Sequence, residues 1–224
     1  MVATLKHIFI SRNLKKDSIF QALLEGKAVV EAQSLMEFEG LPVQELPTCD
    51  WLFFYSKKGL EFGWPSLKEL SPMPQIAVLG TASGEYLQQK FGQAADFVGT
   101  GEPVGTAAAF LEWAKEKQVC FVQAQHSRQS VANLLGDKIK AQQLVVYNNI
   151  PKSTLKLPVC DILVFTSPMN AQTYYTHYQA KEEQEIIAIG KTTAKALEEL
   201  GIKNYLIAPA PHERALANCC LSLL

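Results

Sequence analysis

The chain has 224 residues, of which 48% are hydrophobic and 19% are charged, and its formal net charge is −1. This length is enough for two domains of about 100 residues each. A net charge near zero excludes a global attraction to nucleic acid or to an anionic membrane, and no apolar run is long enough to cross a bilayer. The five cysteines form no C-x-x-C pair. Reduced thiols in a cytoplasmic protein are therefore expected.

Short apolar runs alternate with amphipathic segments along the chain. Strands are predicted at 7–11, 28–32, 51–55, 75–79, 95–98, 119–123, 143–147, 161–165, 185–189 and 204–207. Helices are predicted at 17–25, 83–91, 106–117, 127–135, 168–178, 191–200 and 213–223. Most of the strands are apolar on successive residues, which is typical of parallel strands buried on both faces. The alternation predicts an α/β fold with parallel sheets flanked by helices.

The chain also contains an internal repeat. Residues 49–56 (CDWLFFYS) resemble residues 160–167 (CDILVFTS), and residues 76–83 (IAVLGTAS) resemble residues 186–193 (IIAIGKTT). Both pairs are separated by about 110 residues, which is half the chain, so two similar domains are predicted.

The two domains are not simply consecutive. The strands at 7–11 and 28–32 precede the first repeat and have no later copy, so they are predicted to complete the sheet of the second half, with about five strands in each sheet. Domain A is then 1–37 plus 150–224, and domain B, 40–147, is inserted within it. Two short linkers, near 34–42 and 147–153, would form a hinge beside a central cleft.

Hydroxyl, glycine and basic residues follow most of the predicted strands, immediately before helices. Ligands of parallel sheets bind beyond the carboxyl ends of the strands, where helix starts favour anions. The candidate binding residues are Arg12, Ser56, Lys57, Ser83, Arg128, Thr166, Ser167, Thr192 and Thr193. Any single Ser or Thr here is also explained by helix capping, and any single Lys by solvation. The whole set favours a ligand with many carboxylates.

Other chemistry has less support in the sequence. The four histidines lack metal-ligand spacing, so no metal site is predicted. Residues 99–105 (GTGEPVG) resemble a dinucleotide-binding loop but have one residue too many before the last glycine. No cofactor is therefore expected.

The ordered motifs resemble those of the uroporphyrinogen-III synthase family. They include a first strand that ends in a basic residue (IFISR, 8–12), a turn in each domain (FYSK, 54–57, and FTSP, 165–168) and a helix start (IGKTTA, 189–194). A strand leading back to the first domain (VVY, 145–147) completes the set. The resemblance covers the whole chain in order and implies two flavodoxin-like domains.

The resemblance also implies an activity, a lyase of heme and tetrapyrrole biosynthesis. Such an enzyme cyclises hydroxymethylbilane to uroporphyrinogen III, with loss of water and inversion of ring D through a spiro intermediate. Tyr147 would donate a hydrogen bond to the leaving hydroxyl, and backbone N–H groups at Ser56, Ser83, Ser167, Thr192 and Thr193 would bind the carboxylates. The resemblance further implies a cytoplasmic monomer that needs no cofactor and that receives its small-molecule substrate from the preceding enzyme of the pathway.

Two other interpretations stay open at this point. One is a non-catalytic two-domain protein that binds an anionic small molecule, and the other is a dinucleotide-binding reductase. Turnover of hydroxymethylbilane distinguishes the first from the enzyme, and cofactor affinity tests the second.

Overall fold

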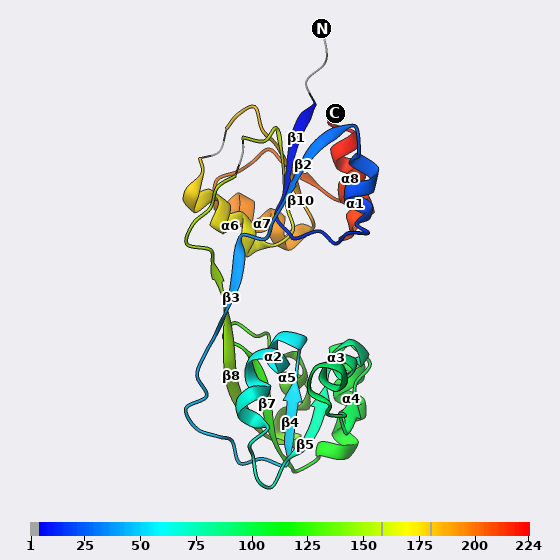
Figure 1. Ribbon diagram of the computed structural model, residues 1–224, viewed down its shortest axis with the longest axis vertical. Coiled ribbons are helices and arrows are strands. Elements are labelled where there is room, and N and C mark those ends of the chain that lie inside the picture. The colour runs from blue at the N-terminus through cyan, green and yellow to red at the C-terminus, as the bar shows by residue number, and fades with distance from the viewer. Residues whose placement is uncertain (1–4, 158, 180) are drawn as a thin grey trace. The chain divides into compact units, whose positions relative to one another are not determined.

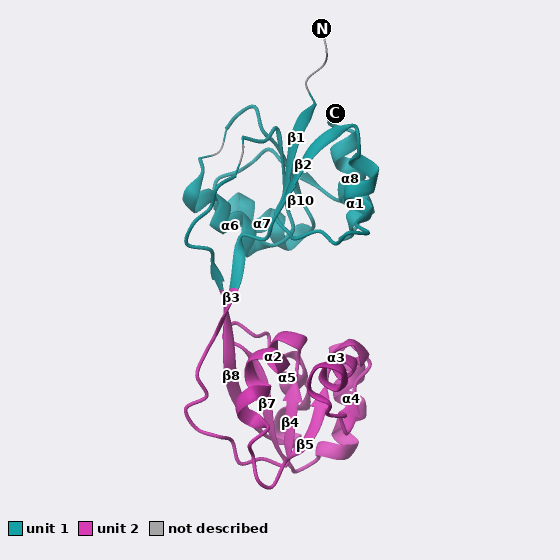
Figure 2. Ribbon diagram, in the orientation of Figure 1, with its two compact units in different colours: residues 1–37, 150–224 teal, residues 38–149 magenta. Residues whose placement is uncertain are grey.

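The apolar runs of the sequence form two separate sheets, each in its own unit of the chain (Figure 2). The structure is a computed structural model that describes residues 5–157, 159–179 and 181–224. Unit 1 comprises the described residues up to Glu37 together with those from Ile150 to Leu224, and unit 2 comprises Phe38–Asn149. The chain therefore passes from one unit to the other twice.

The sheet of unit 1 has five parallel strands. They are β1 (Lys6–Ile10), β2 (Ala28–Ala32), β9 (Ile162–Phe165), β10 (Glu185–Ala188) and β11 (Leu206–Ile207), in the order β11-β10-β9-β1-β2. Strand β1 pairs with β9, with Ile8 beside Ile162. This confirms the prediction that the first two strands complete the sheet of the second half. The strand order is that of flavodoxin-like sheets.

Helices cover both faces of this sheet, which explains why its strands are apolar on successive residues. One face carries α1 (Ile19–Leu24) and α8 (Glu213–Leu221), which pack together, and the other carries α6 (Pro168–His177) and α7 (Lys191–Glu199) (Figure 1). Phe20 and Leu216 are buried on the first face, and Tyr174 and Leu197 on the second. The sheet is thus the middle layer of three.

The sheet of unit 2 has six strands rather than the five expected. They are β3 (Met36–Gly40), β4 (Trp51–Phe54), β5 (Gln75–Val78), β6 (Phe97–Val98), β7 (Gln118–Ala124) and β8 (Lys140–Pro151), in the order β3-β8-β7-β4-β5-β6. The five strands from β4 to β8 are parallel to one another.

The additional strand, β3, makes this sheet mixed. The N–H of Leu41 donates to the carbonyl of Val146 (2.9 Å), and the N–H of Lys152 donates to that of Leu35 (2.9 Å). These pairings run in opposite directions along the chain, so β3 and β8 are antiparallel. The segments at 34–42 and 147–153, expected as linkers, are therefore largely strands. Strand β3 was not predicted because its polar and apolar residues alternate over only five positions.

Four helices and a short 3₁₀ turn, Gly136–Lys138, accompany the unit 2 sheet. Helices α2 (Lys57–Leu67) and α3 (Thr81–Phe91) cover one face, and α4 (Pro103–Ala114) and α5 (Ser130–Leu135) cover the other. Helix α2 contains two glycines and Pro65, which disfavour a helix by propensity. Close packing explains one of them, because a Cβ on Gly63 would lie 2.9 Å from the Val122 side chain.

The two sheets have the same strand order when β4, β5 and β6 are aligned with β9, β10 and β11. Strands β7 and β8 then correspond to β1 and β2. The connections change direction between β1 and β9 in unit 1, and between β4 and β7 in unit 2. These switch points are where ligands of parallel sheets bind. Across the three described ranges, no helix combines the length and the apolar character that a membrane crossing requires.

Candidate active site

The switch point of unit 1 holds a pair of hydroxyl residues that bond to each other. The Thr166 N–H donates to Ser11 Oγ (2.8 Å), and the Thr166 hydroxyl donates to the Ser11 carbonyl (2.8 Å). Ser11 is fully buried, and Arg12 follows it with a half-buried side chain. The reciprocal bonds fix the ends of β1 and β9, so Thr166 has a structural role here in addition to any contact with a ligand.

Ser167 begins helix α6 beside this pair. Its hydroxyl accepts hydrogen bonds from the N–H of Asn170 (3.2 Å) and from the Asn170 side-chain amide (2.8 Å). The other side-chain atom, Asn170 Oδ1, accepts from the Leu35 N–H (2.8 Å). Asn170 therefore connects the start of α6 to the segment that precedes β3.

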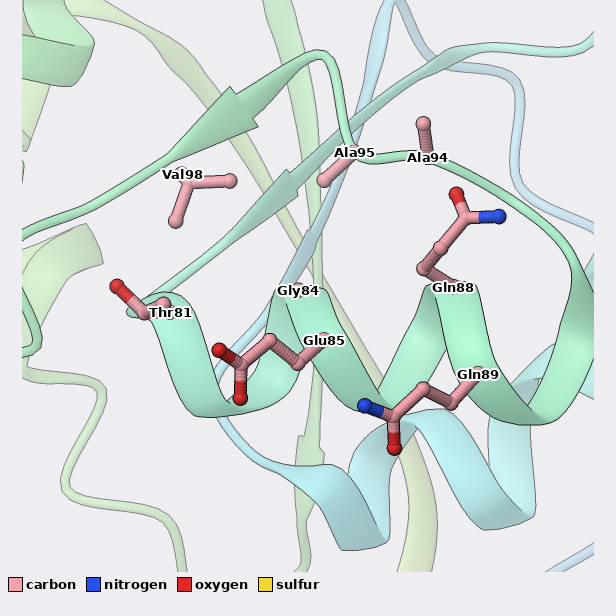
Figure 3. Close-up of a pocket in the computed structure, with 8 residues that line it drawn as sticks. All are labelled: Thr81, Gly84, Glu85, Gln88, Gln89, Ala94, Ala95 and Val98. Carbon is pink, nitrogen blue, oxygen red and sulfur yellow. The ribbon is translucent and has the colours of Figure 1, made fainter.

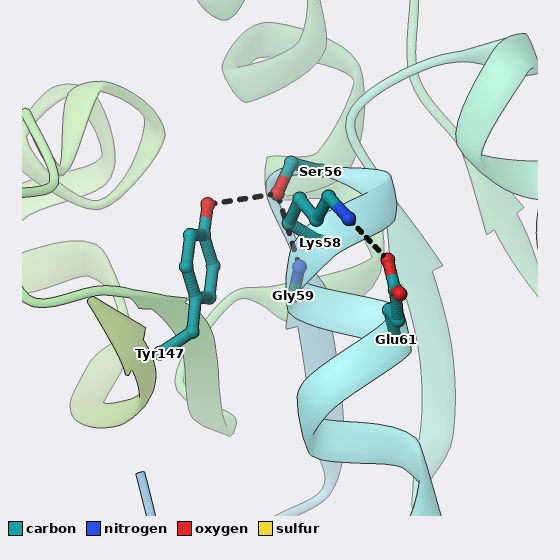
Figure 4. Close-up of polar contacts among 5 residues, drawn as sticks. All are labelled: Ser56, Lys58, Gly59, Glu61 and Tyr147. Carbon is teal, nitrogen blue, oxygen red and sulfur yellow. Dashed lines mark hydrogen bonds and ion pairs between the residues drawn. The ribbon is translucent and has the colours of Figure 1, made fainter. Parts of the chain in front are cut away.

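The corresponding position in unit 2 has a different partner. Ser56 begins helix α2, and its Oγ accepts from the Gly59 N–H (3.1 Å). The same oxygen lies 3.2 Å from the hydroxyl of Tyr147 on β8, and either group can be the donor (Figure 4). The structure thus brings together two residues that the sequence predicted as separate site residues, 91 positions apart.

Aromatic rings surround Tyr147, which is 9% exposed. Phe62 stacks on its ring at a centroid distance of 5.6 Å, and Phe38 meets it edge-on at 5.9 Å. A register shift at Gln123 places Tyr147 opposite Ala124 at the end of β7. The ring is held by packing while its hydroxyl reaches the start of α2.

The starts of α3 in unit 2 and α7 in unit 1 have the same local structure. Gly80 precedes α3 and Gly190 precedes α7, and neither makes a side-chain cap. The N–H groups of Ser83 and Thr193 donate to the carbonyls of these glycines, at 3.0 and 3.1 Å. Both side chains are buried, whereas Thr192 is exposed.

Because the amides of Ser83 and Thr193 already donate to these glycines, a ligand can be bound only by other amides of the two helix starts. The amides of the first helical turn lack an acceptor within the helix, and because the third of them donates here to the preceding glycine, the first two remain available. At α3 these belong to Thr81 and Ala82, and at α7 to Lys191 and Thr192. A pocket of about 210 Å³ opens at the start of α3, lined by Tyr55, Leu79, Gly80, Thr81, Ala82, Ser83 and Gly101.

Tyr55 connects this pocket to helix α5. Its hydroxyl accepts a hydrogen bond from the Ala132 N–H (3.0 Å). Burial raises the pKa of the Tyr55 hydroxyl, and the bonds from the backbone of Ala132 and Val131 act in the opposite direction. The group therefore stays protonated near neutral pH.

The other basic residues are less constrained. Lys57 is exposed, with its ammonium 5.8 Å from the Tyr86 ring centroid, and Arg128 is exposed in the segment before α5. Lys58, which was not among the predicted binding residues, lies 4.9 Å from the Phe38 ring centroid and pairs with Glu61 at 2.7 Å. Phe38 lies on β3, between two glutamates. This short alternation of polar and apolar residues was the one signal in the sequence that could have identified β3 and its exposed ring.

Another hollow in unit 2 does not suit a substrate with many carboxylates. A pocket of about 390 Å³ lies between α3 and β6 (Figure 3). It is lined by Thr81, Gly84, Glu85, Gln88, Gln89, Ala94, Ala95 and Val98. Its one charged residue is acidic, so it lacks the cations that would attract such a ligand. In the described part of the chain, no cluster of three or more His, Cys, Asp or Glu could hold a metal ion.

Solved structures provide relatives of this fold. A uroporphyrinogen-III synthetase from Helicobacter pylori matches with a TM-score of 0.68 and 24% identity, covering 98% of this chain and 100% of that one. A mutant uroporphyrinogen III synthase from the extremely thermophilic bacterium Thermus thermophilus matches with a TM-score of 0.53 and 17% identity, covering 97% and 98%. At these identities the likeness shows the fold alone.

The sequence itself identifies the family. Comparison with curated proteins gave no significant match. The sequence profile of the family described as uroporphyrinogen-III synthase HemD matches residues 17–218, which is most of the chain. The resemblance found in the motifs is thereby confirmed, and the chain belongs to the uroporphyrinogen-III synthase family of cyclising lyases.

Proposed function

We propose that this protein converts hydroxymethylbilane to uroporphyrinogen III and that Tyr147 acts at the leaving hydroxyl. The family assignment supports the overall reaction, and neither the binding-protein nor the reductase alternative is favoured. The observation that carries the assignment of Tyr147 is its hydroxyl contact with Ser56 at the carboxyl edge of the sheet.

The first step is the loss of water from the hydroxymethyl group. The C–O bond breaks as the pyrrole nitrogen supplies electrons, which leaves an azafulvene. The departing oxygen gains one proton, and the pyrrole N–H releases one, so the step is balanced. A positioned hydrogen-bond donor at the leaving oxygen assists such a step.

The contacts of Ser56 favour Tyr147 as that donor. Ser56 Oγ already accepts from the Gly59 N–H, so its own proton is available for the Tyr147 oxygen. The phenolic proton of Tyr147 is then available for an acceptor on the substrate. Phe38 and Phe62 hold the ring, which restricts the direction of this proton.

The later steps depend on orientation. The azafulvene is attacked by the substituted carbon of the last ring, which gives a spiro intermediate whose fragmentation and re-closure invert that ring. Closure at the nearer, unsubstituted position would give the type I isomer instead. Holding a flexible chain with eight carboxylates in one geometry is therefore the main task of the protein.

We propose that the strand ends bind these carboxylates. The starts of α3 and α7 offer amides that lack an intrahelical acceptor and can bind a carboxylate. The side chains proposed to bind carboxylates beside them are those of Arg12, Lys57, Arg128, Thr166, Ser167 and Thr192. Ser83 and Thr193 would act by holding their helix starts in place, since their own amides are engaged. Ser56 would position Tyr147.

We also propose that the protein acts as a monomer in the cytoplasm and receives its substrate from the preceding enzyme of the pathway. The cysteines support a reducing compartment, because Cys120, Cys160 and Cys220 are buried in the cores, as structural thiols of reduced proteins are. Burial raises the pKa of Cys160 to about 11 and that of Cys220 to about 12, so these thiols stay protonated and unreactive.

One assay tests the proposed reaction. Purified protein is supplied with hydroxymethylbilane without added metal or cofactor, and the product is oxidised and separated into its isomers. The type III isomer is expected, while heat-inactivated protein should give type I at the uncatalysed rate. Formation of type I alone by the native protein, at that same rate, would show that the proposed function is wrong.

A further inference from the structure

Four side chains near Tyr147 have no contact with the substrate in the steps described above, although two of them hold the Tyr147 ring. They are Phe38 on β3 and Lys58, Glu61 and Phe62 on α2, and we call them the Phe38 platform. All four belong to unit 2, as does Tyr147.

Phe38 is the outermost ring of this group. It is 47% exposed, although it contacts a tyrosine that is 9% exposed. Phe62 is half-buried because it lies between Tyr147 and Gly40, where a Cβ would be 2.9 Å from Phe62 Cδ1. Phe62 therefore supports Tyr147, whereas Phe38 contacts Tyr147 and leaves much of its own surface open.

Lys58 adds a cation to the open ring. Its ammonium lies 4.9 Å from the Phe38 centroid and 5.8 Å from that of Phe62. Figure 4 shows its ion pair with Glu61, at 2.7 Å. Both charged side chains are 37% exposed. An exposed ion pair on a helix contributes little to stability, so Lys58 can exchange Glu61 for another carboxylate at small cost.

An exposed aromatic ring with an exchangeable cation suits one kind of ligand group, an electron-rich aromatic ring that carries carboxylates. Each pyrrole of a carboxylated tetrapyrrole has this chemistry. We propose that Phe38 stacks against the terminal pyrrole that bears the hydroxymethyl group, and that Lys58 leaves Glu61 to bind a carboxylate of that ring. This inference rests on the proposed function and adds the residues that bring the leaving oxygen to Tyr147.

The stacking part is tested with Phe38→Leu and Phe38→Trp. Stacking of a heteroaromatic ring on an aromatic side chain is strong enough that removing it should raise KM about tenfold. The leucine variant should show this rise together with a larger share of the type I isomer, because poorly held substrate closes in solution. The tryptophan variant keeps an aromatic ring, so its KM and its share of the type I isomer should both lie within about twofold of the wild-type values.

The cation part is tested with Lys58→Gln, Lys58→Arg and Glu61→Gln. Lys58→Gln should raise KM about fivefold, since a charge-assisted contact is lost. Lys58→Arg should recover most of that loss. Glu61→Gln releases the ammonium and should leave KM equal or lower. The matched control is Lys195→Gln, which removes the lysine of another exposed helical ion pair, with Glu199, and should not change KM.

The outcomes separate the two proposals. If the wild type forms no type III isomer, the proposed function fails. If it does, but Phe38→Leu has wild-type KM and isomer ratio, the stacking role is wrong. Equal rises of KM in Lys58→Gln and Glu61→Gln would show that the ion pair only supports the helix, and would overturn the proposed exchange.

Discussion

The two units contain the same turn but use it differently. Ser56 and Ser167 each follow a central strand and cap a helix through the amide three positions later. In unit 1 that position is Asn170, which is 7% exposed and bonds both to Ser167 and to the Leu35 backbone. In unit 2 it is Gly59, where a Cβ would lie 3.2 Å from the Val122 carbonyl.

The difference lies in which group contacts the capping hydroxyl. In unit 1 the side chain of Asn170 occupies the capping hydroxyl and fixes a neighbouring segment. In unit 2 no side chain is present at that position, and the capping hydroxyl contacts Tyr147 instead. We infer that unit 2 carries the reacting group and that unit 1 contributes binding.

The largest expected effect tests whether the two sheets are independent. A chain in which a short Gly/Ser linker replaces residues 38–149 should fold as unit 1, because β1 pairs with β9 and Leu35 lies beside Lys152. A fragment of residues 1–110 should fail to fold, because it lacks β9 of one sheet and β7 of the other. Cooperative unfolding in urea is the measurement.

The isolated segment 38–149 is the control, since it contains all five parallel strands of unit 2 and should unfold cooperatively. Cooperative folding of the 1–110 fragment would contradict the assignment of β1 and β2 to the sheet of the second half.

The next effect tests the chemistry assigned to unit 2. Tyr147→Phe removes the proposed donor and keeps the ring, so kcat should fall up to about 100-fold, the low end of general-acid effects, with little change in KM. Loss of one hydroxyl should cost about 1 kcal/mol of stability, which leaves the fold intact. Single-turnover and steady-state rates are the measurements.

A tyrosine of unit 1 provides the matched control. The Tyr178 hydroxyl accepts from the Leu157 N–H (2.9 Å) and donates to the Leu155 carbonyl (3.1 Å). Tyr178→Phe should therefore lower stability by about 1 kcal/mol and leave kcat unchanged. A normal kcat for Tyr147→Phe at saturating substrate would make Tyr147 a packing residue and remove the asymmetry between the units.

Much of the likeness between the two units could be predicted from the sequence, because it depends on local sequence patterns. The repeated segments at 49–56 and 160–167 identified equivalent strands, and a hydroxyl after each identified the helix caps. The same pattern selected Ser56 and Ser167 as site residues. Ten of the eleven described strands also follow from apolar runs, since strands buried on both faces need no alternation.

The remaining features depend on contacts between distant residues. Helix α2 is absent from the predicted helices because its two glycines and Pro65 oppose a helix, and close packing on β7 overrides that preference. The contact of Ser56 with Tyr147 joins residues on β8 and α2, and no spacing in the sequence indicates it. Phe38 was missed because the strand that carries it was interpreted as a linker.

The smallest effect concerns the supporting role of unit 1. Asn170→Ala leaves the Leu35 N–H without its acceptor and removes the side-chain bond to Ser167, which should cost about 2 kcal/mol of stability. Asn170→Asp keeps the acceptor and adds a negative charge near a helix start, so it should cost less than about 1 kcal/mol. Urea unfolding measures both. Because unit 1 holds no proposed reacting group, kcat should change less than about threefold in either variant. A loss of kcat in Asn170→Ala as large as that in Tyr147→Phe, with unchanged stability, would mean that Asn170 serves the reaction and that support and chemistry are not divided between the units.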